Sequence, residues 1–164
     1  MATLVQLRKS GALCDYNPAL APGVEAMRTL DGSPRFVKWF KEVLPTLGAT
    51  WQIELTPEQQ LDDFLAAYAA GEPLMIDRQF KNLRPLTHDI WELKTGDLRL
   101  IGWFYKKDQF LCDAANTAQI MKDHNLYPGM IAEVVRFRNL LDLDEPKFVP
   151  GDDPHAVISN FTYP

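Results

Sequence analysis

The stretch that decides the fold begins with Ile90-Trp-Glu-Leu-Lys94, turns at Thr95-Gly-Asp97 and continues as Leu98-Arg-Leu-Ile-Gly-Trp-Phe-Tyr105. Apolar and polar residues alternate in its first part, which is the period of a half-buried strand. The Gly-Asp pair is typical of a hairpin turn. A second polar break at 106–109 precedes Phe110-Leu-Cys-Asp113. The sequence therefore predicts three short antiparallel strands joined by two tight turns.

The alternation also assigns the side chains of the second strand to two opposite faces. Arg99 shares a face with Trp103 and Tyr105, whereas the leucines and Phe104 point the other way. A guanidinium in this position can hold a phosphate, and a neighbouring aromatic ring can stack on a base. The same spacing also fits an arginine that only pairs with Glu92 across the hairpin. Spacing alone favours this second interpretation.

Helices are expected on both sides of the strands in the sequence. Ser33-Pro34 and Thr56-Pro57 are typical helix starts, and Gln59 can complete a capping box with Thr56. A last helix should begin near Tyr127. The sequence therefore predicts an α+β fold: a small antiparallel sheet of three to five strands with helices packed on one face.

The remaining segments give weaker signals. Residues 3–7 can form a strand, 24–30 one or two helical turns, and 51–55 a short strand or a connector. We expect an N-terminal extension over 1–34, a main domain over 35–141 and a C-terminal extension over 142–164. The last of these is acidic and rich in proline, which predicts a loosely ordered tail that can return as an edge strand over 156–161.

Composition places the chain among ordinary globular proteins. It has 164 residues, of which 46% are hydrophobic and 24% charged. No apolar run is long enough for a membrane helix, and the first residues lack the pattern of a signal peptide. We therefore expect a cytoplasmic protein in which Cys14 and Cys112 are reduced thiols.

The charge is unevenly distributed. The net charge is −5, which argues against a general nucleic-acid binder. Residues 78–107, however, contain seven basic and only three acidic side chains. Such a patch is compatible with a local phosphate site. It is equally compatible with lysines that merely solvate the edges of a hairpin.

Several common site signatures are missing from the sequence. It contains no glycine-rich phosphate loop, no zinc-type spacing of Cys and His, and no Gly-x-Ser-x-Gly nucleophile elbow. We therefore expect neither a cofactor nor a metal ion, and the residues by themselves propose no classical hydrolase.

The central motifs resemble those of a toxin family. Phe80-Lys-Asn-Leu83, Ile90-Trp-Glu-Leu-Lys94 and Leu98-Arg-Leu-Ile101 are similar in order and spacing to the RelE/HigB superfamily of toxin-antitoxin toxins, above all to its phage-derived HigB-type branch. The family places F-x-x-L, W-E-L-R/K and x-R-I/L-x-x-F after two helices. The resemblance extends over about residues 35–141 and is most specific in its central third.

The resemblance implies a metal-independent endoribonuclease that cuts mRNA on the ribosome, through attack of the 2′-hydroxyl on the neighbouring phosphate. Carried over by motif, Arg99 would stabilise the phosphate and Lys94 would supply a second cation. His124 and Lys122 are candidates for acid or base. The candidate residues for contact with RNA are Lys81, Arg84, Trp103 and Tyr105. The implied partners are an antitoxin, mRNA and the ribosome, with a homodimer possible.

The sequence also departs from the family. Ile90 and Glu92 stand where one RelE branch has lysines, and the basic cluster expected after the last long strand is missing. An alternative therefore remains open: a non-catalytic phage or prophage interaction protein with a RelE-like fold that binds a host protein. A basic concave groove around Arg99 with His124 or Lys122 nearby would favour the enzyme. Burial of Arg99 against Glu92, or cover by the acidic tail, would favour the binding protein.

Overall fold

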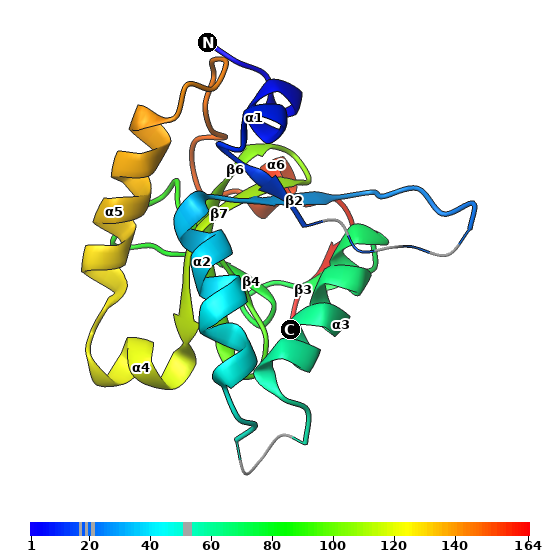
Figure 1. The fold of residues 1–164 in the computed structure, drawn as a ribbon, viewed down its shortest axis with the longest axis vertical. Coiled ribbons are helices and arrows are strands. Elements are labelled where there is room, and N and C mark those ends of the chain that lie inside the picture. Colours follow the sequence, from blue (N-terminus) through cyan, green and yellow to red (C-terminus); the bar gives the residue numbers. More distant parts are fainter. Residues whose placement is uncertain (17, 19, 21, 51–53) are drawn as a thin grey trace.

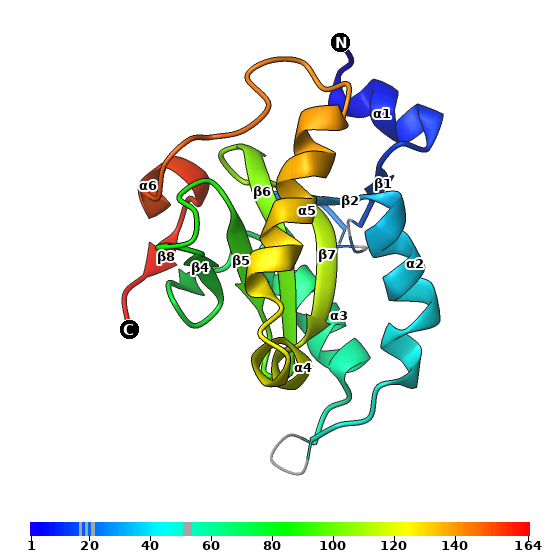
Figure 2. The ribbon, with the colours of Figure 1, turned by 90° about the vertical axis from the view of Figure 1, so that its left-hand side faces the viewer.

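The computed structural model describes residues 1–16, 18, 20, 22–50 and 54–164. Within these residues, six strands form one sheet in the order β1-β2-β7-β6-β5-β4 (Figures 1 and 2). Their bounds are Cys14–Asp15 (β1), Thr29–Gly32 (β2), Phe80–Asn82 (β4), Trp91–Lys94 (β5), Leu98–Lys106 (β6) and Gln109–Thr117 (β7). Only β2 and β7 run parallel; the other neighbours are antiparallel. The fold is α+β as expected, but the sheet is mixed and wider than predicted.

Six α-helices lie among the described residues. They are Leu4–Ser10 (α1), Pro34–Glu42 (α2), Pro57–Ala69 (α3), Ala118–Asp123 (α4), Tyr127–Leu140 (α5) and Pro154–Val157 (α6), with a short 3-10 turn over Leu44–Thr46. Ser33 caps α2, and Thr56 and Gln59 form the predicted capping box of α3. The chain leaves α3 through Gly71, whose φ of 78° lies in the left-handed region that favours glycine.

Helices cover both faces of the sheet, so the prediction of helices on one face was wrong. One core cluster joins α2 and α3 to one face through Phe36, Phe64 and Tyr68. The other joins α5 to the opposite face through Ile131 and Val134. Figure 2 shows α5 in front of the sheet and α3 behind it. The physical reason lies in β6, which is apolar on both faces and needs cover on each side.

The three-stranded meander was predicted correctly, and β7 extends beyond Asp113 to Thr117. Leu98, Leu100 and Phe104 face the α3 side, whereas Ile101 and Trp103 face the α5 side. The alternation of side chains between the two faces continues past a register irregularity between Ile101 and Gly102. A Cβ at Gly102 would lie 1.9 Å from the carbonyl oxygen of Leu111, so only glycine fits this close approach.

The N-terminal residues contribute to the same sheet. Residues 4–10 form α1 instead of the expected strand, because Thr3 and Gln6 build a capping box. The helical turns expected over 24–30 are also absent, since Thr29 begins β2, which lies between β1 and β7. Of the segment predicted as a strand or connector over 51–55, residues 51–53 lie outside the described residues.

The C-terminal segment packs along the molecule and is not the loose tail that was expected. The Val149 amide donates to the Phe104 carbonyl, and the Asp108 amide donates to the Val157 carbonyl. Its last strand, Phe161–Thr162 (β8), pairs in parallel with Leu74–Met75 (β3). Residues 142–164 are therefore part of the same core as the sheet.

Two further expectations can be checked directly. Cys14 is exposed and Cys112 is buried, and both are free thiols as predicted. Among the described helices, none is both long enough and apolar enough to cross a membrane.

Candidate anion-binding site

A cavity of about 440 Å³ opens at the end of the sheet where β4, β5 and β6 meet the turn between α4 and α5. Five basic side chains contribute to its wall. They come from β4 and the loop after it, from β5, from β6 and from α4, and are Lys81, Arg84, Lys94, Arg99 and Lys122. We call this cavity the basic pocket. Glu92, Tyr127 and Asn125 complete its polar lining.

The register of the strands brings these side chains together. Lys94 lies directly opposite Arg99, and Lys81 lies opposite Glu92. Residues two apart on a strand share a face, so Glu92 and Lys94 point to the same side of the sheet. The pairing of Arg99 with Glu92 that the hairpin spacing favoured is not the observed register, because Glu92 lies opposite Ile101.

The pocket has an excess of positive charge. Among the described residues, no carboxylate forms a salt bridge with Lys81, Lys94, Arg99 or Lys122. The Lys94 Nζ donates to the carbonyl oxygen of Asp77 at 3.0 Å. The Arg99 Nη1 donates to the carbonyl oxygens of Thr95 and Leu98 at 2.7 and 2.8 Å, which holds the guanidinium in place.

The charge excess changes the acidity of Lys94. Partial burial lowers the pKa of this ammonium below its ordinary value, and the nearby Arg99 lowers the pKa further. Lys81 and Lys122 act in the same direction, whereas Glu92 opposes them. Cations that repel one another in a cavity are stabilised when an anion binds among them.

A carboxylate and a phenol form the neutralising part of the wall. Glu92 is 3% exposed, and its Oε2 accepts a hydrogen bond from the Tyr127 hydroxyl at 2.7 Å. Burial and the Glu92 carboxylate both raise the pKa of Tyr127, and Arg99 opposes this shift. The phenol therefore stays protonated and fixes the position of the carboxylate.

The rim of the pocket is in contact with the C-terminal segment. Asp152 Oδ2 accepts from Arg84 Nη1 at 3.0 Å and lies 3.2 Å from His88 Nδ1. Asn125 lies on the rim too, with a φ of 47° in the left-handed region. Arg84 is thus the one predicted cation of this pocket with a described acidic partner.

Arg99 connects the basic pocket to two neighbouring cavities. One, of about 570 Å³, is lined by Thr117, Gln119 and Lys122, and the other, of about 630 Å³, by Arg78 and Lys94. Both are lined by Arg99 as well. The hollow surface therefore continues around the end of the hairpin, with Arg99 at the centre.

Three predicted site residues lie outside the basic pocket. Trp103 is fully buried under α5 and donates through its Nε1 to the Lys147 carbonyl at 2.9 Å. Tyr105 is also buried, and its hydroxyl donates to the Asp144 carbonyl at 3.2 Å. His124 ends α4 with an exposed side chain and lines none of the three cavities around Arg99.

Sequence reasoning missed Tyr127 as a member of this site. It was noted only as the start of the last helix, and it lies far in sequence from the hairpin that it contacts. Glu92 could have indicated such a partner, because a carboxylate in a strand that is buried on both faces needs a hydrogen-bond donor from another element.

Comparison with known proteins assigns the chain to no family. No family model, no curated protein and no solved structure matches it. Among the described residues there is also no group of three or more His, Cys, Asp or Glu side chains arranged to hold a metal ion.

Proposed function

We propose that the basic pocket binds the phosphate backbone of RNA and that the protein is a toxin-like endoribonuclease. The observation that supports this proposal is the meeting of Lys81, Lys94, Arg99 and Lys122 beside the Glu92–Tyr127 pair. Cations without acidic partners suit a phosphate, and a carboxylate at the same wall suits proton transfer. The resemblance of the hairpin motifs to RelE/HigB toxins points in the same direction.

In the proposed reaction, Arg99 and Lys94 hold the non-bridging oxygens of the scissile phosphate. Their charges stabilise the extra negative charge of the pentavalent transition state. Arg99 is suited to this role because its guanidinium is already held by the Thr95 and Leu98 carbonyl oxygens. A preorganised donor costs little reorganisation when the reaction occurs.

Glu92 is the proposed base and Lys122 the proposed acid. The Glu92 carboxylate takes the proton of the 2′-hydroxyl while the 2′-oxygen forms a bond to phosphorus. The bond from phosphorus to the 5′-oxygen breaks, and the Lys122 ammonium gives that oxygen its proton. The products are a 2′,3′-cyclic phosphate and a free 5′-hydroxyl. Tyr127 positions Glu92 through their hydrogen bond.

The decisive experiment is induced expression of the wild type and of Arg99→Ala, with Lys9→Ala on α1 as a control that removes a distant exposed cation. We expect growth arrest and mRNA cleavage with the wild type and with Lys9→Ala, and neither with Arg99→Ala. Normal growth with wild-type protein at good yield, together with intact RNA after incubation with purified protein, would refute the ribonuclease.

A second candidate is a non-catalytic interaction protein that binds a host protein. The contact of Asp152 with Arg84 favours it, because the acidic C-terminal segment covers part of the cationic rim. In that case the wild type would neither arrest growth nor cleave RNA, and Arg99→Ala would still bind the host partner. If the ribonuclease proposal is right, the partner to seek is an antitoxin, and co-expression with it would restore growth.

A further inference from the structure

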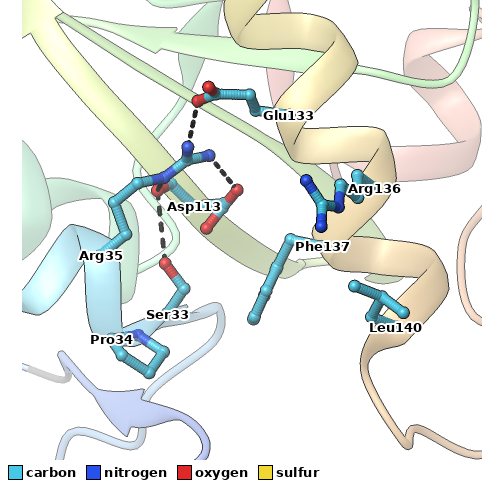
Figure 3. Close-up of a pocket in the computed structure, with 8 residues that line it drawn as sticks. All are labelled: Ser33, Pro34, Arg35, Asp113, Glu133, Arg136, Phe137 and Leu140. Atoms are coloured by element: carbon cyan, nitrogen blue, oxygen red, sulfur yellow. Dashed lines mark hydrogen bonds and ion pairs between the residues drawn. The ribbon is translucent and has the colours of Figure 1, made fainter.

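A second cavity of about 440 Å³ lies between α2, β7 and α5 (Figure 3). Its lining shares no residue with the basic pocket, although α5 contributes to both. The lining combines two carboxylates, two guanidinium groups and an apolar wall. Cavities of this size that combine an apolar surface with a few convergent polar groups are typical of small-molecule sites.

Asp113 forms the floor of this second cavity. Its side chain is 2% exposed and pairs with the Arg35 guanidinium. The Nε of Arg35 and the hydroxyl of Ser33 both donate to the Asp113 backbone carbonyl, at 3.2 and 3.3 Å. Burial raises the pKa of the Asp113 carboxyl, and hydrogen bonds from Ser33 and the charge of Arg35 oppose this shift. The carboxylate is thus fixed in position at the base of the cavity.

Arg35 also pairs with Glu133 on α5, so that one guanidinium bridges two carboxylates. Figure 3 shows this bridge along one side of the cavity. One positive charge shared by two negative charges leaves this side with a net negative charge. A bound ammonium group would compensate it.

Arg136 supplies the opposite charge. Its guanidinium points into the cavity in Figure 3, and among the described residues it has no acidic partner. A guanidinium has five donors in a planar fork that matches a carboxylate. This side of the cavity is therefore suited to a bound carboxylate.

Apolar side chains separate the two charged sides. Phe137 and Leu140 extend from α5, and Pro34 faces them from the start of α2. Leu140 is 73% exposed, so its side chain offers apolar surface at the edge of the cavity.

We propose that this cavity binds a small zwitterion, an α-amino acid with an apolar side chain. The ligand carboxylate pairs with Arg136, and its ammonium group is bound by the carboxylates of Glu133 and Asp113. The ligand side chain packs on Phe137, Leu140 and Pro34. The four charged residues of the lining sum to zero, which favours a ligand without net charge. The proposal is independent of any activity at the basic pocket.

The test titrates the purified full chain with L-leucine and follows backbone amide shifts by NMR. Two analogues each lack one charge: 4-methylpentanoate lacks the ammonium group and leucinamide lacks the carboxylate. We expect saturable binding of leucine, with affinity lower by about tenfold or more for either analogue. Equal binding of all three compounds, or no saturable shift with leucine, would overturn the proposal.

Two variants locate the site without disturbing the buried floor. Arg136→Gln and Glu133→Gln change exposed positions on α5 and should each weaken leucine binding by about tenfold or more. Arg99→Ala is the matched control and should bind leucine as the wild type does, whether or not the basic pocket cleaves RNA. Wild-type affinity in Arg136→Gln would overturn the assignment.

Discussion

The Tyr127 hydroxyl donates a hydrogen bond of 2.7 Å to the carboxylate of Glu92, joining the start of α5 to the middle of the hairpin. Glu92 is buried and Tyr127 is half-buried, so the carboxylate depends on this phenol as its donor. Replacing Tyr127 by Phe should lower the free energy of unfolding by about 1–3 kcal/mol, because it leaves the Glu92 carboxylate without this donor. Urea denaturation measures the change.

The control for that change is Tyr163→Phe, since Tyr163 is largely exposed. It should shift the free energy of unfolding by less than about 0.5 kcal/mol. If Tyr127→Phe is as stable as this control, the Glu92 carboxylate has another donor and the positioning role of Tyr127 is wrong.

The lowered pKa of Lys94 predicts a pH-dependent affinity for anions. As the pH rises, Lys94 loses its proton earlier than a lysine with the ordinary value of 10.5, so pyrophosphate binding should weaken from a correspondingly lower pH. Calorimetry with pyrophosphate across this range measures the affinity. Lys94→Arg keeps the charge and should bind without that early decline; an identical decline in the variant would contradict the assignment to Lys94.

The same shift affects the stability of the unliganded protein. Below 10.5 the unfolded chain holds the Lys94 proton more tightly than the folded chain does. The contribution of Lys94 should therefore increase the free energy of unfolding as the pH rises towards 10.5. The Lys94→Arg variant should lose that contribution.

Salt dependence tests whether the cations of the basic pocket contact phosphates. Binding of a single-stranded DNA oligonucleotide, which lacks the 2′-hydroxyl and so is not cleaved by the proposed reaction, should weaken as salt rises. Lys122→Ala should reduce the slope of log affinity against log salt by about 0.7, the value for one phosphate contact on a single strand. Fluorescence anisotropy measures the slope, and Lys9→Ala should leave it unchanged. An unchanged slope in Lys122→Ala would remove this lysine from the proposed interface.

Gly102→Ala should destabilise the sheet strongly. The added Cβ would meet the Leu111 carbonyl oxygen at 1.9 Å and the Cys112 Cα at 3.0 Å, so two strands must separate. We expect a loss of about 3 kcal/mol in the free energy of unfolding. Gly48→Ala meets open space and should change it by less than about 0.5 kcal/mol. Equal stability of the two variants would show that β6 and β7 can separate at little cost.

Local signals predicted the three longest helices and the central strands. The capping residues Ser33 and Thr56 mark helix starts by chemistry that needs no distant contact. The alternation in 90–105 likewise gave the strands and the faces of their side chains. The same reasoning failed at residues 3–7, where a strand was expected although Thr3 and Gln6 form a capping box that begins α1.

Contacts between distant segments could not be predicted from patterns. The cluster of basic residues in 78–107 was visible in the sequence, and four of the five cations of the basic pocket come from it. Tyr127 approaches Glu92 only because α5 packs on the sheet. Arg35 meets Asp113 because α2 packs on β7, and it meets Glu133 because α5 lies beside them. Trp103 and Tyr105 were placed on the correct face, but the cover of that face by α5 and by residues 144–147 was not foreseen.

The parallel pairing of β2 with β7 has a consequence for how the protein folds as it is synthesised. Thr29–Gly32 emerges from the ribosome long before its partner residues Gln109–Cys112 exist, so the edge of β2 that faces β7 has no partner while both hairpin turns are made, although β1 can already pair with the other edge. Pairing across such a separation in sequence is slow, because the loop must close before any contact is gained. Until then one edge of β7 is open to other chains. Shortening the N-terminus to residue 35 would make that exposure permanent, and such a fragment should aggregate.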